Sequence, residues 1–289
     1  MLKKTHIPVI SVLCLFFLCV PAQLPAAEIP ENEKCVANEL YSPFALDYTA
    51  DGLLLGASAG TAITGLVLNK RSKQPEWYER TYNKKDIPAL DKIWYNKYSS
   101  VLDNTGTVVC AVNLLVLPIT TFTVETAIKN LPARELATIG VMYAESWLFA
   151  YGIRNIIKTS VHRIRPYMYT EKIDESELKS HDFEFSFPSG HTTDAFLGAS
   201  FVSYVFSTYY PQSQYKWPII AGSYAIAVGT GALRIASGNH FLTDVLGGAA
   251  LGTALGFGIP FIHQKLAQSK HGRNGISLLP NGVNACFYF

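Results

Sequence analysis

The sequence predicts an all-α protein built as a six-helix transmembrane bundle, and three observations support that prediction. Six apolar segments recur along the 289 residues, each near the roughly 20 residues that a helix needs to cross a bilayer. Only 16% of the residues are charged, against about 25% in ordinary soluble domains. Small residues recur inside the apolar segments, which lets helices approach closely in lipid. A water-soluble helical bundle is the alternative, because Glu125, Glu145 and Arg154 interrupt the apolar segments.

The chain begins with the pattern of a secretory signal peptide, residues 1–27. Lys3 and Lys4 precede an apolar stretch, and small residues follow up to Ala27. We expect cleavage near Ala27, with an uncleaved membrane anchor as the alternative. Residues 28–51 are then an N-terminal extension.

Residues 52–263 are expected to form the helical membrane domain, and residues 264–289 a C-terminal tail that folds as a hairpin. Small residues are densest in the first helix, around Gly56 and Gly60, and in the last, around Gly252. In chain order, the expected helices are 52–68, 106–128, 136–157, 192–210, 218–233 and 245–262.

A polar stretch, residues 69–105, separates the first two helices. Its apolar residues recur at spacings of three and four from Leu90 to Leu102, which predicts an amphipathic helix. Trp94 and nearby lysines suit the headgroup layer of a membrane. Packing on neighbouring helices is the alternative.

Charge and cysteine usage exclude two classes of function. The chain has 24 Lys and Arg against 22 Asp and Glu, so it lacks the basic excess that a nucleic-acid partner requires. Its five cysteines show no Cys-x-x-Cys spacing, which excludes structural zinc. Cys35 and Cys286 are the pair left for a disulfide, with two unrelated thiols as the alternative.

Three polar motifs lie at helix ends that the predicted connectivity brings to one side of the membrane. In the first, Lys158 and Arg165 are seven residues apart, or two helical turns, so both point the same way until Pro166 ends the helix. Both cations suit phosphate oxygens. Taken alone, the pair fits two cations that solvate a helix end better than a phosphate site.

The second motif, Pro-Ser-Gly-His, opens the fourth helix. Free backbone N–H groups at a helix start attract an anion, and Gly190 permits close approach of the ligand to the backbone. Ser189 acting simply as an N-cap is the alternative.

The third motif pairs His240 with Asp244 after Arg234. Residues four apart share a helix face, so the carboxylate can hold one imidazole nitrogen and leave the other to attack. A purely structural hydrogen bond is the alternative.

Together the motifs read Lys-x6-Arg-Pro, Pro-Ser-Gly-His and Arg-x5-His-x3-Asp, and this set resembles the type 2 phosphatidic acid phosphatase and vanadium haloperoxidase superfamily. The resemblance implies a helical bundle of that family's type. It implies that His240 is the nucleophile, that Asp244 orients it and that His191 protonates the leaving oxygen. The phosphate-binding residues that it implies are Lys158, Arg165, Ser189, Gly190 and Arg234. Leu233 stands where the family usually has serine, a departure that removes no charge.

The resemblance implies a metal-independent membrane phosphatase that forms a phosphohistidine. Its substrates would be lipid phosphate monoesters or diphosphates: phosphatidic acid, phosphatidylglycerol phosphate, an isoprenoid diphosphate or a lipid A phosphate. We expect no cofactor, and no metal, because clustered cations repel a catalytic dication. A vanadate-dependent haloperoxidase and a non-catalytic carrier of lipid phosphates or anions are the alternatives.

The expected location is the bacterial cell membrane, with a site that faces away from the cytoplasm as the resemblance implies. A cleaved signal peptide followed by six spans places the motif loops in the cytoplasm instead, and the basic residues of 69–105 agree with that by the positive-inside rule. We favour the outward site, with the first segment not fully spanning or the N-terminal segment not translocated. A soluble bundle would remove the conflict.

Other polar residues receive structural interpretations. Glu125 and Glu145 lie inside apolar segments, where we expect hydrogen bonds between helices, with a functional role as the alternative. His162 and Arg163 are expected to be solvated beside a helix end, with contact to the substrate as the alternative. His263 has no partner that the sequence identifies.

Overall fold

The described part of the protein comes from a computed structural model and comprises residues 42–71, 82–128, 130–170, 182–273, 276–279 and 282–285. The chain divides into two units, Met1–Tyr41 and Ser42–Phe289, and every described residue belongs to the second. The predicted signal peptide, Cys35 and Cys286 lie outside the described residues.

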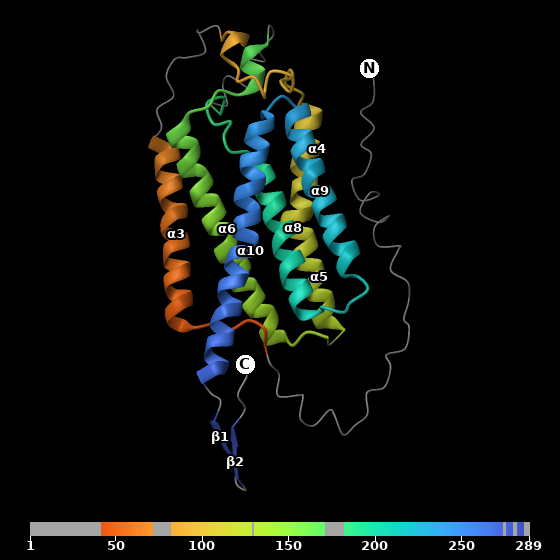
Figure 1. Cartoon of the computed structure of the whole chain (residues 1–289). Coiled ribbons are helices and arrows are strands. Elements are labelled where there is room, and N and C mark those ends of the chain that lie inside the picture. Colours follow the sequence, from red (N-terminus) through yellow and green to blue (C-terminus); the bar gives the residue numbers. More distant parts are fainter. Residues whose placement is uncertain are drawn as a thin grey trace, which may run out of the picture. The chain divides into compact units, whose positions relative to one another are not determined.

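All six predicted helices are present, and they run side by side (Figure 1). The second is a single helical run interrupted by a π-helical turn, η3, which is followed by Pro118. The helices and helical turns are α3 (Tyr48–Arg71), η2 (Lys84–Asp86), α4 (Ser100–Ala111), η3 (Val112–Val116), α5 (Leu117–Ala127), α6 (Ala133–Val161), η4 (Pro166–Tyr169), α8 (Gly190–Tyr209), α9 (Lys216–Ala236) and α10 (Leu242–Arg273).

Five of the helical runs are long and apolar enough to cross a membrane, and α8 is not among them. α8 is the central helix, which packs on α10, α9 and α6, and most of its 20 residues are buried. Because protein rather than lipid surrounds α8, its small and polar residues are compatible with its position. The composition of the other five helices reflects their contact with lipid.

Large aliphatic side chains are exposed along the outer helices. Leu53 is 70% exposed, Ile63 61%, Ile119 57% and Val228 60%. A water-soluble bundle does not present such a surface, whereas lipid tails accept it. The protein is therefore a multi-pass membrane protein.

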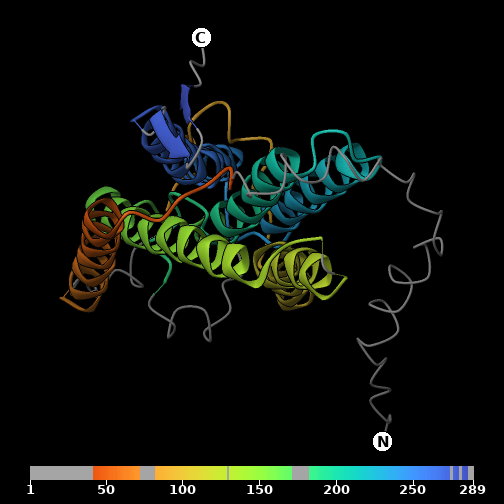
Figure 2. The same cartoon turned by 90° about the horizontal axis from the view of Figure 1, so that it is seen from below.

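Small residues allow close helix contacts at specific positions. A Cβ on Gly252 of α10 would lie 2.2 Å from the carbonyl oxygen of Thr193 on α8. A Cβ on Gly152 of α6 would lie 2.4 Å from the backbone of Thr61 on α3, and Figure 2 shows these two helices together at one edge of the bundle. Nothing lies within 4 Å of such a Cβ on Gly56. The close contact of α3 is therefore made further along the helix than Gly56, in the part that holds Thr61.

The predicted amphipathic helix between Leu90 and Leu102 is wrong. Within residues 82–99, the described part of that stretch, helical structure is limited to η2 and tight turns, and α4 begins at Ser100. Ser99 caps α4 by accepting a hydrogen bond from the backbone N–H of Leu102. Asp91 is buried and accepts a hydrogen bond from the start of α10. This contact explains why the stretch does not form the predicted amphipathic helix.

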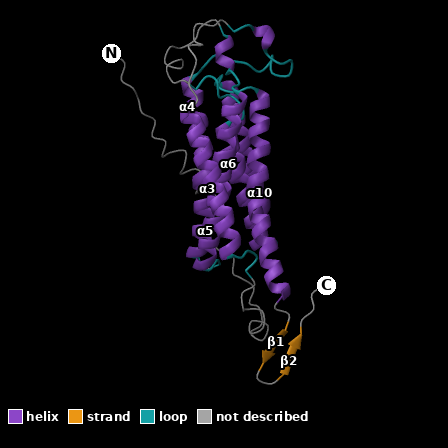
Figure 3. Cartoon of the chain, turned by 90° about the vertical axis from the view of Figure 1, so that its left-hand side faces the viewer, coloured by secondary structure: helices purple, strands orange, loops and turns teal. Residues whose placement is uncertain are grey.

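The C-terminal helix is longer than predicted. α10 contains Pro260 and continues past Ile262 to Arg273. The strands β1 (Ile276–Leu279) and β2 (Gly282–Ala285) then pair antiparallel, with Ile276 opposite Ala285 (Figure 3). The expected hairpin is confirmed.

Candidate active site

The three motifs meet at one end of the bundle, where α6 and α9 end and α8 and α10 begin (Figure 1). The end of α6 differs from the prediction. The helix stops at Val161 because His162 adopts a left-handed conformation with φ of 48°. Lys158 therefore lies on the last turn of α6, whereas Arg165 follows in a loop and does not share a helix face with it.

His240 lies between α9 and α10 and is 2% exposed. Its Nδ1 is 2.8 Å from the carbonyl oxygen of Ser186. A carbonyl oxygen only accepts, so Nδ1 carries the ring proton of the neutral imidazole and Nε2 keeps its lone pair. The ring is thereby held in the tautomer that a nucleophile needs.

Asp244 does not hold His240 directly. Its Oδ2 is 3.8 Å from Nδ1, beyond hydrogen-bond distance. That oxygen accepts instead from the Ser186 hydroxyl at 2.5 Å and from the backbone N–H of Phe241 at 2.8 Å. Asp244 is therefore connected to His240 through Ser186, whose hydroxyl binds Asp244 and whose carbonyl oxygen binds His240.

Arg163 forms an ion pair with Asp244, and the prediction that it is simply solvated is wrong. Its Nη1 donates to Asp244 Oδ1 at 2.5 Å and to the Thr243 hydroxyl at 2.6 Å. Its Nη2 donates to Asp91 Oδ2 at 2.6 Å, and its guanidinium lies over the ring of Phe241. One arginine thus joins two fully buried carboxylates.

The two predicted arginines of the phosphate site are both buried. Arg165 is 4% exposed and donates to the carbonyl oxygen of Asp182 at 2.8 Å and to Asn239 Oδ1 at 2.8 Å. It also forms an ion pair with the Asp182 carboxylate. Arg234 is 2% exposed and forms an ion pair with Asp103 of α4.

The charges that act on His240 come from residues that the three motifs predicted for the site. Burial lowers the pKa of His240 well below its ordinary value, and the charges of Arg165, Arg234 and Lys158, followed by that of His191, lower it further. His240 is therefore neutral at neutral pH. The same cations that suppress its protonation are the groups expected to attract a phosphate.

His191 occupies the first turn of α8, and its Nε2 is 3.1 Å from the hydroxyl oxygen of Thr107 on α4. That hydroxyl donates its proton to the carbonyl oxygen of Asp103 at 3.1 Å. It accepts from His191 in consequence, so Nε2 of His191 carries a proton.

Ser189 stands at the N-cap of α8, but its side chain makes no capping hydrogen bond. Its hydroxyl lies 2.9 Å from that of Thr192, and its backbone N–H donates to the carbonyl oxygen of Asp244. The carbonyl oxygen of Gly190 accepts from Arg154 at 3.2 Å, and Arg154 also pairs with Asp194 at 2.6 Å. The start of α8 is thus fixed from two sides.

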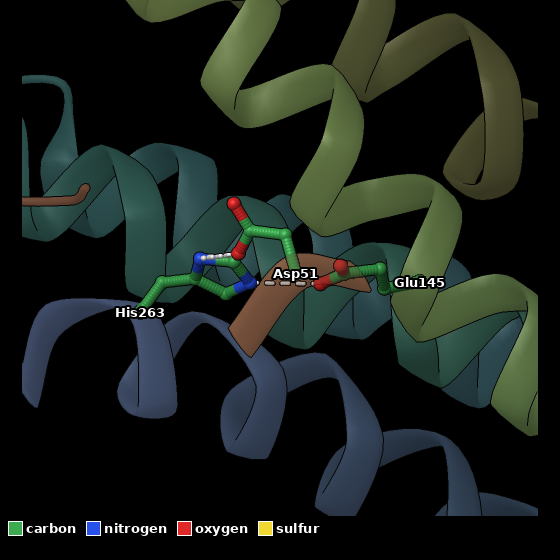
Figure 4. A group of neighbouring side chains, drawn as sticks. All are labelled: Asp51, Glu145 and His263. Carbon is green, nitrogen blue, oxygen red and sulfur yellow. Dashed lines mark hydrogen bonds and ion pairs between the residues drawn. The ribbon is translucent and has the colours of Figure 1, made fainter. Parts of the chain in front are cut away.

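A second polar cluster, Asp51, Glu145 and His263, lies inside the bundle and outside this site (Figure 4). Nε2 of His263 is 2.7 Å from Glu145, and Nδ1 is 3.6 Å from Asp51. Each carboxylate approaches a different ring nitrogen of His263. The expected helix-to-helix hydrogen bond of Glu145 is confirmed, and it joins α6 to α10. Glu145 precedes Lys158 by thirteen residues, about 20 Å along α6.

Comparison with known proteins agrees with the motifs. Residues 139–268 match the PAP2 superfamily profile. Phosphatidylglycerophosphatase B of Bacillus subtilis (strain 168) is 31% identical over 134 residues, which are 43% of this chain and 62% of that protein. The chain thus spans less than two thirds of that relative's length.

A solved structure is also similar, that of a transmembrane PAP2-type phosphatidylglycerolphosphate phosphatase from Bacillus subtilis. It is 24% identical, with a TM-score of 0.33, and the match covers 58% of this chain and 89% of that one. The matched family segment, 139–268, includes Lys158, Arg165, the start of α8, Arg234, His240 and Asp244. The similarity to the PAP2 superfamily thus covers the segment that holds all three motifs.

Proposed function

We propose that this protein is a membrane phosphatase that removes phosphate from lipid monoesters or diphosphates through a phosphohistidine, without a metal. One observation carries the proposal. His240 is buried and neutral, its Nδ1 is committed to the Ser186 carbonyl, and three cationic side chains act on its ring. This combination suits a nucleophile that attacks an anionic phosphorus centre.

In the first step, Nε2 of His240 attacks phosphorus and the bond to the lipid oxygen breaks. Arg165, Arg234 and Lys158 stabilise the charge on the phosphoryl oxygens as it redistributes. Ser189 and the backbone N–H of Gly190 add donors at the start of α8. The cations supply positive charge that a metal would otherwise bring.

His191 serves as the proton donor to the departing oxygen. As an imidazolium, it gives up the Nε2 proton that the Thr107 hydroxyl holds and is left as a neutral ring. In the second step, water attacks phosphorus, the P–N bond breaks and His191 takes the proton from water. Orthophosphate leaves and His240 is regenerated.

Asp244 acts as a positioning residue in this scheme. It holds Ser186 and the backbone of Phe241, on either side of His240. The Ser186 carbonyl then stabilises the positive charge that develops on the ring as Nε2 bonds to phosphorus.

The substrate is proposed from chemistry and from one relative's name. Phosphatidylglycerol phosphate is the first candidate, because the relative that is 31% identical is a phosphatidylglycerophosphatase. Phosphatidic acid, isoprenoid diphosphates and lipid A phosphates present the same terminal phosphate to the cations.

The test is phosphate release by protein purified in detergent, with chelator present, from these four lipids and one soluble phosphomonoester. We expect His240→Ala to abolish release and an acid-labile phosphoenzyme to form in the unaltered protein. His162→Asn is the matched control, since His162 is an exposed neighbour of the site and asparagine accepts its left-handed backbone. Full activity of His240→Ala, or loss of activity with chelator, would refute the mechanism.

We further propose that the site faces away from the cytoplasm and that the N-terminal segment is not translocated, because an exported N-terminus followed by the candidate span α3 would place the site end in the cytoplasm. Lys92 is exposed at the site end, so Lys92→Cys reports the side of the membrane. An outward site predicts labelling by a membrane-impermeant maleimide in intact cells. Labelling that requires permeabilised cells would place the site in the cytoplasm.

A further inference from the structure

A turn formed by residues 88–94 lies beside the site and outside every helix that could cross a membrane. The backbone N–H groups of Asp91 and Lys92 donate to the carbonyl oxygen of Pro88, at 2.9 and 3.2 Å. The N–H of Trp94 donates to the Asp91 carbonyl at 3.0 Å. We call this segment the 88–94 turn.

The inner side of the 88–94 turn is anchored to the site by Asp91, which is 0% exposed. Its carboxylate accepts from the backbone N–H of Thr243 at 3.0 Å, from the Thr243 hydroxyl at 2.7 Å and from Arg163 at 2.6 Å. Arg163 and Thr243 both adjoin Asp244. The turn therefore cannot move without disturbing the start of α10.

The chain that follows is fixed to the end of α9. Asn96 donates to the carbonyl oxygen of Ile235 at 3.1 Å, and the N–H of Ser99 donates to that of Ser237 at 3.0 Å. A Cβ on Gly238 would lie 2.6 Å from the carbonyl oxygen of Asn96. The 88–94 turn is thus supported by both helices that flank His240, by the start of α10 through Asp91 and by the end of α9 through Asn96 and Ser99.

The outer side of the 88–94 turn is apolar. Leu90 is 57% exposed, Ile93 79% and Trp94 43%. A water-facing turn would bury these side chains and expose the aspartate, whereas here the aspartate is buried and the apolar groups point outward. Contact with the hydrocarbon core does not explain this exposure, because the turn is not part of a spanning helix.

Four exposed lysines flank these apolar residues in the sequence, against one exposed acidic residue, Asp86; they are Lys84, Lys85, Lys92 and Lys97. Tryptophan, aliphatic side chains and lysines together favour the headgroup layer, where rings and methyl groups insert and ammonium groups meet lipid phosphates. The lysine excess selects anionic lipids.

We propose that the 88–94 turn is a docking element that inserts Leu90, Ile93 and Trp94 into the headgroup layer of an anionic bilayer. Because Asp91 joins the same turn to Arg163 and Thr243, docking sets the depth of the catalytic end relative to the lipid surface. The phosphates of lipid substrates lie in that layer. The turn therefore holds the site level with them.

The first test requires no enzyme activity. The protein is reconstituted in vesicles of phosphatidylglycerol and phosphatidylcholine whose chains carry bromine near the headgroup or near the bilayer centre, and tryptophan quenching is measured. We expect the shallow label to quench a component that disappears in Trp94→Phe. Trp217→Phe is the matched control, since Trp217 is 71% exposed at the opposite end of α9. Identical quenching in Trp94→Phe and unaltered protein would overturn the proposal.

The second test rests on the proposed phosphatase function. Ile93→Ser/Trp94→Ser is compared with unaltered protein on a lipid phosphate in vesicles and on a soluble phosphomonoester. We expect a loss of more than about tenfold on the vesicle lipid, because removal of one apolar side chain from its site already corresponds to about tenfold and this variant removes two, and no loss on the soluble compound. Equal loss on both would overturn the docking role. Absence of activity on both in unaltered protein would refute the proposed function, and quenching would then decide the docking proposal alone.

Discussion

Removal of Arg163 is expected to destabilise the protein strongly. Its side chain is 18% exposed, and it pairs at 2.6 and 2.5 Å with Asp91 and Asp244, whose side chains are 0% exposed. Arg163→Met leaves both carboxylates buried without their counter-charge. A broken buried ion pair costs about 3–5 kcal/mol. At about 2–4 °C per kcal/mol for a chain of this length, the unfolding midpoint should fall by about 10 °C.

The assay is thermal unfolding in detergent, followed by tryptophan fluorescence. Arg134→Met is the matched control, because Arg134 is 61% exposed and its ion pair with Glu135 contributes well under 1 kcal/mol. Asp91→Asn in the Arg163→Met background should recover part of the loss, since it removes one uncompensated charge. A midpoint for Arg163→Met within about 2 °C of the unaltered protein would refute the reasoning.

Three other outcomes follow from the structure. Because the pKa of His240 lies below its ordinary value, activity should persist as pH falls through about 6.5, and an acid limb of kcat/KM centred at or above that pH would contradict its assignment. Gly252→Ala should lower the unfolding midpoint, because its Cβ would meet an α8 carbonyl at 2.2 Å, whereas Gly140→Ala, with nothing within 4 Å, should raise it. His263→Leu should unfold at lower temperature than His263→Leu/Glu145→Leu, because the single change leaves a buried carboxylate without its partner at 2.7 Å.

The sequence predicted the helices well because their apolar segments are long and separated by clear polar breaks. α8 shows the limit of hydropathy, since its polar residues reflect burial by α10, α9 and α6. The stretch from Leu90 to Leu102 shows the limit of periodicity. Its spacing of three and four suits a helix, but the long-range bonds from Asp91 to Thr243 determine its conformation.

The sequence identified the residues of the candidate site but only some of the contacts between them. The spacing of Lys158 and Arg165 predicted that both lie on one face of a helix. That reason is wrong, because α6 ends between them. The Ser186 carbonyl that binds His240 left no signal, because a backbone group can come from any residue type. Arg163 lay in the first motif, but its partner Asp91 comes from a segment with no motif.

Both buried arginines of the site are paired with carboxylates of their own chain, Arg165 with Asp182 and Arg234 with Asp103. A phosphate that binds these arginines must displace or outcompete a tethered anion. The carboxyl side chain of Asp182 is 51% exposed and that of Asp103 23%, so Asp182 is the easier of the two to exchange.

This competition discriminates by charge. A phosphate monoester carries about −1.5 to −2 charges at neutral pH, whereas the phosphodiester headgroups that dominate a bilayer carry one. A single negative charge gains little by replacing another, while a dianion gains a full additional interaction with the cations. On the proposed function, the protein's own carboxylates would keep the abundant diester lipids from occupying a site meant for a scarce monoester.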